Sequence, residues 1–233
     1  MAESRGIITG IKDETPNTKT FRVKLDKPIN FLPGQFAMLC LTIEGQLVKR
    51  AYSFSSSPAN PKDVEFTVKR APDGKFAPHL FSSRINDAVT VEGPHGIFTY
   101  IDNSARDLVL IAGGSGIAPM RAIIRHILEQ KQDVRIQLIY ANKTLRDIIF
   151  KEELDELSSA NDNLALHYVL ENPPSGWKGG AGFITHDFIK KRVRDFSKPL
   201  FYICGPPPMV QKMIETVTRL GATHDRIKLE QFN

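Results

Sequence analysis

The run VKRAYSFSSSP at residues 48–58 combines two cations, two aromatic rings and four serines in a segment that alternates like a β-strand. Successive strand residues point to opposite faces, so we expect Arg50, Tyr52 and Phe54 on one face and Ser53 and Ser55 on the other. A guanidinium suits a phosphate, and an aromatic ring suits a flat heterocycle. The run therefore favours a large ligand with a planar part and an anionic part. An ordinary edge strand with a solvated arginine is the alternative.

A glycine-rich turn within LVLIAGGSGIAPMRAIIRHI, residues 108–127, is the second candidate for chemistry. An apolar strand leads into glycines at 113, 114 and 116, and we expect a helix to start near Pro119. Glycines let a backbone approach a phosphate, whose charge is met by N–H groups and by the helix dipole. The spacing differs from the G-x-G-x-x-G of ordinary dinucleotide-binding folds, so a purely structural tight turn is the alternative.

A similar junction follows in FYICGPPPMVQKMI, residues 201–214, where Cys204 and Gly205 end an apolar strand and Met209 enters a helix. Ligands of open α/β sheets bind at the carboxyl ends of strands, so we expect Cys204 and Gly113 to face one crevice. A buried cysteine that only fills space is the alternative.

The chain falls into two parts that differ in their pattern of predicted secondary structure. Six short strand-like segments separated by turn residues occupy 6–12, 18–25, 35–43, 49–55, 63–70 and 87–93. This spacing predicts a small antiparallel barrel or sandwich. Strand-like segments at 107–114, 134–142, 164–170 and 199–205 then alternate with helix-like segments at 118–131, 147–159, 185–193 and 207–221. The alternation predicts a doubly wound parallel sheet, with domains at residues 1–102 and 103–233.

Composition narrows the function classes. The net charge of +5 and pI near 9.2 favour an acidic partner, but acids and bases are interspersed, so we expect no nucleic acid. No apolar run reaches the roughly 18 residues of a membrane helix, and no signal peptide is recognisable, so we expect a cytoplasmic protein. Two cysteines cannot supply the thiolates of an iron–sulfur cluster, and the six histidines lack metal-ligand spacing, so we expect no metal.

Seven motifs in order resemble the ferredoxin–NADP reductase superfamily of two-domain flavoproteins. They are PGQF at 33–36, R-x-Y-S at 50–53, VKRAPDG at 68–74, GPHGIF at 93–98, GGSGIAP at 113–119, CGPPPMV at 204–210 and the terminal LEQFN. The stretches YANKTLRDIIFKEEL and PPSGWKGGAGFIT resemble its cytochrome b-five reductase and oxygenase-reductase branch. The resemblance implies an N-terminal six-stranded antiparallel Greek-key β-barrel for FAD, followed by a C-terminal α/β doubly wound parallel sheet for NAD(P)H.

The same resemblance assigns FAD contacts in the first domain. It implies that Arg50 pairs with the diphosphate, that Tyr52 packs on the isoalloxazine and that Ser53 hydrogen-bonds near flavin N5. Further implied FAD contacts are Ala51, Val68, Lys69, Gly74, Lys75, Phe76, Ala77 and, covering or adjoining the ring, Phe232. The chain departs from the family at Ala77, where Ser or Thr is usual, and at Pro78, which has no N–H, so one phosphate contact is lost.

In the second domain the resemblance implies nicotinamide nucleotide contacts. These are Gly114, Ser115, Gly116, Asn142, Cys204, Gly205, Pro206 and Met209. Ser53, Cys204 and Glu230 form the implied catalytic set, in which the glutamate polarises or relays protons. NADH is expected over NADPH because the uncharged Asn142 ends a strand where the adenosine ribose would lie, although Lys143 and Arg146 could reach a 2′-phosphate.

The implied activity is hydride transfer from nicotinamide C4 to flavin N5, with electrons passed to a separate acidic protein such as a ferredoxin, a cytochrome or an oxygenase component. Two alternatives stay open. A reductase of free flavin is favoured by the Ala77-Pro78 departure. A non-catalytic flavin-binding subunit is disfavoured by the presence of Ser53, Cys204 and Glu230.

Overall fold

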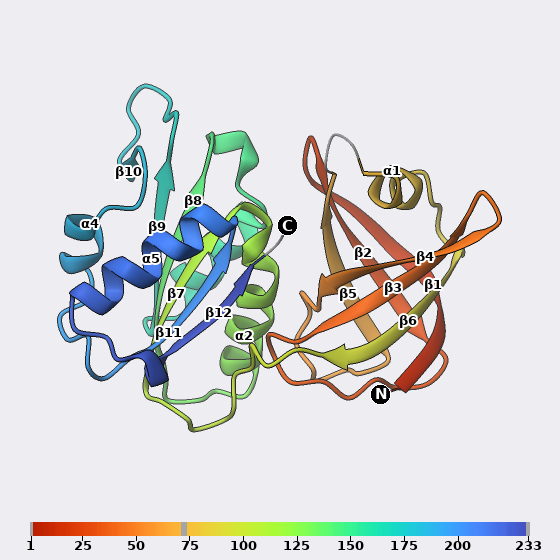
Figure 1. Cartoon of the computed structure of the whole chain (residues 1–233), viewed down its shortest axis with the longest axis horizontal. Coiled ribbons are helices and arrows are strands. Elements are labelled where there is room, and N and C mark those ends of the chain that lie inside the picture. The colour runs from red at the N-terminus through yellow and green to blue at the C-terminus, as the bar shows by residue number, and fades with distance from the viewer. Residues whose placement is uncertain (1, 71–73, 232–233) are drawn as a thin grey trace. The chain divides into compact units, whose positions relative to one another are not determined.

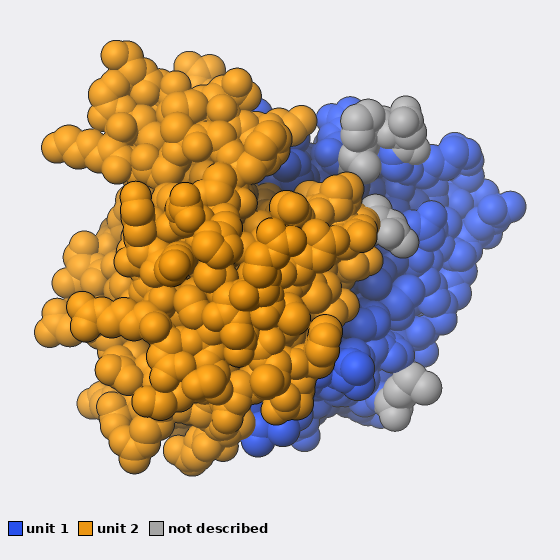
Figure 2. Space-filling view, turned by 60° about the vertical axis from the view of Figure 1, so that its left-hand side comes forward, with its two compact units in different colours: residues 1–101, 121–126 blue, residues 102–120, 127–233 orange. Residues whose placement is uncertain are grey.

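The computed structural model describes residues 2–70 and 74–231 (Figure 1). The chain divides into two compact units, shown in different colours in Figure 2. Unit 1 comprises residues 1–101 together with 121–126, and unit 2 comprises 102–120 together with 127–233. Each unit has a hydrophobic core of its own.

Unit 1 is a curled antiparallel sheet. Its elements are β1 (Ala2–Thr15), β2 (Thr18–Leu25), β3 (Phe36–Ile43), β4 (Gln46–Ser53), β5 (Asp63–Lys69), the short helix α1 (Phe76–Phe81) and β6 (Ala88–His95). The strand order is β4-β3-β6-β1-β2-β5. An antiparallel bridge between Phe54 and Phe66 joins the segment after β4 to β5, so the two outermost strands of the sheet meet. The predicted six-stranded antiparallel barrel is confirmed.

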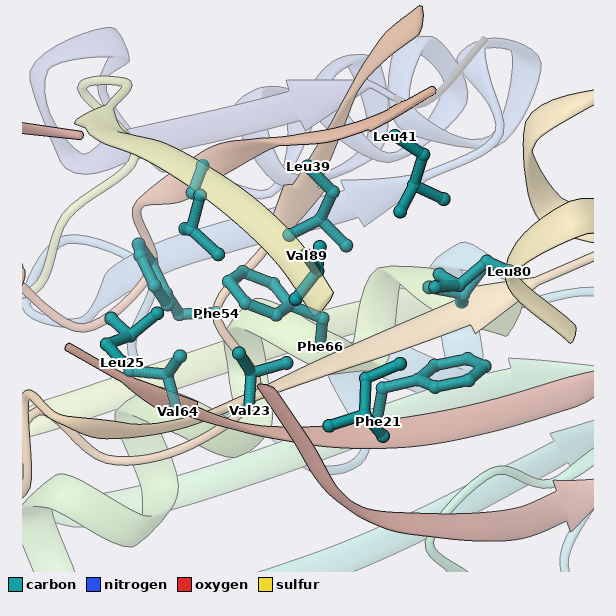
Figure 3. Packing of buried hydrophobic residues seen from close by; sticks show 14 of the residues in the cluster. Phe21, Val23, Leu25, Leu39, Leu41, Phe54, Val64, Phe66, Leu80 and Val89 are labelled. Atoms are coloured by element: carbon teal, nitrogen blue, oxygen red, sulfur yellow. The ribbon is translucent and has the colours of Figure 1, made fainter. Parts of the chain in front are cut away.

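Alternation of apolar and polar residues builds the core of unit 1. In β2, Phe21, Val23 and Leu25 are buried while the intervening Arg22 and Lys24 are exposed, as expected for a strand with one face on a core. Figure 3 shows these side chains gathered with others from the barrel strands. Phe54 joins this core instead of sharing the exposure of Arg50, because β4 ends at Ser53.

Unit 2 is a parallel sheet with helices. Its elements are β7 (Asp107–Gly113), the 3-10 turn η1 (Gly114–Gly116), α2 (Ile117–Glu129, of which residues 121–126 belong to unit 1), β8 (Arg135–Asn142), η2 (Leu145–Asp147), α3 (Lys151–Ala160), β9 (Leu164–Leu170), β10 (Gly180–Ala181), α4 (His186–Lys190), β11 (Leu200–Gly205), α5 (Pro207–Arg219), η3 (His224–Arg226) and β12 (Ile227–Gln231). The strand order β10-β9-β8-β7-β11-β12 confirms the predicted doubly wound sheet. The sequence did not predict β10 and β12 as strands, because one is two residues long and the other is half-exposed.

The central strands of unit 2 place their carboxyl ends along one edge. β7 and β11 are buried along nearly their whole length, as parallel strands covered on both faces are. In register, Cys204 lies opposite Ala112, and Gly113 lies opposite Ala141. The glycine turn after β7 therefore lies between the ends of β8 and β11, where ligands of such sheets bind.

Candidate functional site

The proposed FAD-contact strand is β4, at one end of the strand order of unit 1. Arg50 is exposed, and its Nη1 donates a hydrogen bond to the Lys49 carbonyl at 2.8 Å. Tyr52 is half-buried against the core, with its ring centroid 5.8 Å from that of Phe76 in α1. Burial raises the pKa of Tyr52 to about 12, so its phenol is neutral at physiological pH. The arginine therefore offers an exposed charge beside a neutral aromatic ring, on the same face of the strand.

Ser53 and Ala51 occupy the other face of β4, where Ser53 is buried and Ala51 is exposed. Across the barrel, Val68 is fully buried in β5 and Lys69 is half-exposed at its end. The family resemblance groups these residues as FAD contacts; the Val68 side chain packs in the core of unit 1, so its backbone groups would make any such contact.

Helix α1 follows Gly74, and Lys75 is its N-terminal capping residue, without a side-chain hydrogen bond to the first turn. Phe76 and Ala77 are buried, at 3% and 6% exposure, so their side chains pack on the core and only their backbone groups can meet a ligand. Pro78, third in the helix, supplies no N–H group. The start of α1 thus has fewer donors for an anion than a helix without proline.

A buried polar network joins Ser55, just after β4, to Glu65 and Thr67 of β5 and to Arg121. The sequence analysis did not predict it. Arg121, which belongs to unit 1, donates from Nη1 to the Ser55 carbonyl at 2.7 Å and to Glu65 Oε2 at 2.6 Å. The Thr67 hydroxyl donates to Ser55 Oγ at 2.9 Å. Burial alone raises the pKa of Glu65, but the charges and hydrogen bonds of Arg121 and Arg22 outweigh burial and lower it. The hydroxyl of Ser55 is therefore occupied by the fold.

The glycine turn of unit 2 is shaped by its backbone. Gly114 has a φ of 53°, a left-handed conformation that glycine adopts without strain. A Cβ atom on Gly116 would lie 2.2 Å from the carbonyl oxygen of Cys204, so no other residue fits there without a shift. Ser115 and Gly116 lead into α2, where N–H groups lack intrahelical acceptors. The turn can therefore hold an anion through backbone groups and the helix dipole.

Cys204 lies next to this turn and is fully buried. It pairs in register with Ala112 on one side and with Glu230 of β12 on the other. Burial first, and the charge of Glu230 second, raise the pKa of the Cys204 thiol well above its usual value. The thiol is therefore protonated at neutral pH, and two of the three predicted catalytic residues are neighbours in unit 2.

Asn142 ends β8 and is only 6% exposed. Within the described chain its side-chain nitrogen and oxygen make no hydrogen bond, whereas its backbone carbonyl accepts from the Glu171 N–H at 3.0 Å. Leaving a buried amide unpaired is costly. The side chain is thus suited to a polar ligand group at the carboxyl edge of the sheet.

The start of α5 offers less to an anion than the start of α2. Pro206 precedes the helix, and Pro207 and Pro208 open it without N–H groups. Gly205 is buried at the end of β11, and Met209 packs on the core of unit 2. These residues therefore offer shape and apolar surface, and the backbone N–H groups of unit 2 best suited to an anion are those of Ser115 and Gly116.

One predicted ring contact, Phe232, lies outside the described residues. Within residues 2–70 and 74–231, the side chains of His, Cys, Asp and Glu form no group of three or more suited to a metal ion. No helix of the same ranges is long and apolar enough to span a membrane.

Comparison with known proteins covers both units. A family model for an oxidoreductase FAD-binding domain matches residues 6–100, and one for an oxidoreductase NAD-binding domain matches residues 110–215. NADH-cytochrome b5 reductase 1 of Aspergillus clavatus is 37% identical over 226 residues, which cover 92% of this chain and 73% of the relative.

Solved structures agree with this assignment. The ferredoxin reductase in carbazole 1,9a-dioxygenase is 28% identical, with a TM-score of 0.87 over 100% of this chain and 70% of that one. The flavohaemoglobin-like FAD/NAD-binding domain of nitric oxide dioxygenase from Vibrio cholerae O1 biovar El Tor has a TM-score of 0.89 at 22% identity, covering 98% of each chain, and supports the fold alone. The chain therefore belongs to the family of FAD- and NAD-binding oxidoreductase enzymes that includes the NADH-cytochrome b5 reductases.

Proposed function

We propose that this enzyme takes electrons from NADH through bound FAD and delivers them to a separate acceptor protein. The observation that carries the nicotinamide assignment is the buried, unpartnered amide of Asn142 at the carboxyl edge of the sheet of unit 2. It ends the strand next to the one that leads into the glycine turn. A dinucleotide supplies both the phosphates that the turn suits and the hydroxyl groups that the amide needs.

In unit 1, the chain's own residues fit FAD. The exposed Arg50 guanidinium would pair with the diphosphate, the neutral Tyr52 ring would pack on the flavin and Ser53 would hydrogen-bond to it. Gly74 and the first turn of α1 would add backbone donors. Bound there, FAD would supply the redox chemistry between reduced nicotinamide and the acceptor.

In unit 2, the N–H groups of Ser115 and Gly116 would bind the diphosphate of NADH, and Asn142 would meet the adenosine ribose. Gly205, Pro206 and Met209 would line the nucleotide. Cys204 would serve hydride transfer as a neutral thiol, because burial keeps it protonated. Glu230, its register partner, would hold or relay a proton.

For the acceptor, we propose an acidic redox protein. The relatives' names mention cytochrome b5 and a dioxygenase ferredoxin reductase. The net charge of +5 would favour encounter with an acidic partner. Ferredoxin, cytochrome and oxygenase components remain candidates of this chemistry. The cytoplasmic location stays a prediction, tested by fractionation of the source cells.

Reduction of free flavin is the second candidate function, favoured by Pro78. Because this residue removes one N–H from the first turn of α1, the FAD diphosphate loses a donor. Such a reductase would bind flavin as an exchanging substrate.

The test is the colour of the purified protein and its response to NADH without oxygen. A yellow protein that bleaches with NADH, and then reduces a protein acceptor from a panel of ferredoxins and cytochromes, supports the proposal. A colourless protein that reduces added flavin supports the second candidate. A yellow protein inert to both nicotinamide nucleotides would refute both and leave a non-catalytic flavin-binding subunit.

A further inference from the structure

Tyr140 occupies a position in unit 2 that the binding assignments above do not use. It lies in β8 opposite Ala112 and is fully buried. Its hydroxyl donates a hydrogen bond to the Gly114 carbonyl at 2.9 Å and accepts one from the Ile149 N–H at 3.2 Å. A single phenol oxygen therefore joins the glycine turn after β7 to the loop after β8.

The glycine turn needs such a contact. β7 lies between β8 and β11 in the sheet. On the β11 side, Gly116 packs directly on the Cys204 carbonyl. On the β8 side, the Tyr140 hydroxyl holds the carbonyl of Gly114, whose φ of 53° lies in the left-handed region. The turn is thus fixed from both flanking strands.

Fixing the Gly114 carbonyl also fixes the orientation of the Ser115 N–H group. The Gly114 carbonyl and the Ser115 N–H belong to one planar peptide group, in which C=O and N–H point in opposite directions. A carbonyl held on the Tyr140 hydroxyl therefore directs the Ser115 N–H away from that hydroxyl. This N–H is one of the two groups proposed to bind the NADH diphosphate.

Local hydrogen bonds also hold the loop after β8, on the other side of the Tyr140 hydroxyl. Asp147 accepts hydrogen bonds from the Thr144 N–H at 3.0 Å and from the Thr144 hydroxyl at 2.7 Å. Ile149 is fully buried, so its N–H requires an acceptor, and Tyr140 supplies one. Asn142 lies two residues beyond Tyr140 in β8, at the start of this loop.

We propose that Tyr140 is a positioning residue for dinucleotide binding, whose hydroxyl aligns the diphosphate-binding turn with the loop that follows Asn142. The inference rests on the proposed function, because it requires that the turn bind the nucleotide diphosphate. Tyr140 would contact neither of the two reacting atoms, nicotinamide C4 and flavin N5. Its effect is on the affinity for the nucleotide and not on the rate of the chemical step.

The test compares Tyr140→Phe with a matched control, Tyr168→Phe. Tyr168 lies on the neighbouring strand β9, and its hydroxyl donates to Asp155 Oδ1 at 2.9 Å, away from the turn. Calorimetric titration with ADP-ribose should show a roughly five- to tenfold rise in Kd for Tyr140→Phe, the effect of one net hydrogen bond. Tyr168→Phe should bind as the parent does.

Kinetics separate positioning from general destabilisation. In anaerobic stopped-flow mixing, Tyr140→Phe should raise the NADH concentration for half-maximal flavin reduction, while the limiting rate and the FAD content stay unchanged. If the parent binds ADP-ribose and Tyr140→Phe binds it equally well, the inference is wrong and the proposed function stands. If the parent binds no ADP-ribose, the proposed function itself fails.

Amide hydrogen exchange of the parent provides a test that does not depend on the variant folding. ADP-ribose should protect residues 114–118 and 145–150 together, since the hydroxyl links the two segments. Protection confined to 114–118 would overturn the proposed alignment.

Discussion

The two proposed binding regions are built in different ways. In unit 1 the charged group proposed to meet the FAD diphosphate is a side chain on a strand: Arg50 is exposed and donates a hydrogen bond to the neighbouring Lys49 carbonyl. In unit 2 the groups proposed to meet the NADH diphosphate are backbone N–H groups of a turn that packs on Cys204 without room for a Cβ on Gly116. Side-chain contacts can be removed one at a time, whereas a backbone turn changes as a whole. The two regions should therefore respond differently to substitution.

The largest effect should follow Gly116→Val. The new side chain would meet the backbone carbonyl of Cys204, which cannot move without shifting β11. We expect kcat/KM for NADH to fall by about two orders of magnitude, with loss of ADP-ribose binding. FAD content should stay near that of the parent, because unit 1 has a separate core.

The control for this variant is Gly176→Ala, in unit 2. A Cβ there would meet nothing within 4 Å, although its φ of 79° adds some strain. Normal NADH kinetics in Gly116→Val would show that the turn tolerates side chains and would remove the contrast between the two regions.

The second prediction concerns the buried network of unit 1. Arg121→Met leaves the Glu65 carboxylate, 8% exposed, with Arg22 as its remaining partner in the described ion pairs. The free energy of unfolding should fall by roughly 3 kcal/mol in urea titration at pH 7. Arg106→Met, at an exposed ion pair, should cause no measurable change.

The pH dependence of this loss in the free energy of unfolding follows from the titration of Glu65. The folded pKa of this carboxyl is lowered, so its stabilising effect is present above the unfolded value of about 4.3 and is lost as pH falls through the folded value. The stability difference between parent and Arg121→Met should therefore shrink toward acid pH. A difference that stays constant as pH falls from 7 to about 2, well below the unfolded value, would contradict the assigned ion pair.

The sequence predicted the elements that have strong periodicity. The barrel strands alternate over several residues, and the central parallel strands are continuous apolar runs, so both sheets followed from pattern. β12 was missed because its half-exposed residues give no clear pattern. Pattern also cannot reveal long-range partners. The local pattern is that of a cation on a helix surface. Arg121 is nevertheless buried and hydrogen-bonded to Ser55 and Glu65, which are far away in sequence.

The same limit applies to the candidate site. Residue type alone suggested Arg50 and Tyr52, since cations and rings carry their chemistry in the side chain. The role of Tyr140 depends on a register that places its hydroxyl near Gly114, which no local pattern encodes. The unpaired amide of Asn142 likewise became visible only when its surroundings were defined.

The third prediction tests the side-chain character of the unit 1 region. Arg50→Ala should bind FAD roughly tenfold to a hundredfold more weakly, the effect of losing a charge-assisted phosphate contact. Lys49→Ala is the control, because Lys49 lies on the opposite face of β4 and pairs with Glu92. Flavin content is measured by absorbance after gel filtration. Retention of FAD at the parent's level would exclude Arg50 as a diphosphate contact.

The fourth prediction concerns Cys204 as a participant in hydride transfer. Cys204→Ser should slow flavin reduction by about tenfold in stopped-flow mixing, while FAD content is unchanged. Cys40→Ser is the control, because Cys40 is a buried thiol in unit 1. An unaltered rate in Cys204→Ser would assign this thiol to packing alone.

The smallest expected effect is the preference for NADH over NADPH. Asn142 is uncharged and offers no cation to a 2′-phosphate, and the loop after β8 also carries a carboxylate, Asp147, which accepts hydrogen bonds from Thr144. The exposed Lys143 and Arg146 oppose this effect, and exposed charges interact weakly. We therefore expect kcat/KM for NADH to exceed that for NADPH by less than about tenfold. Replacing both cations by alanine should widen the difference by lowering NADPH use alone. A higher kcat/KM for NADPH in the parent would reverse the assignment and identify Lys143 and Arg146 as phosphate contacts.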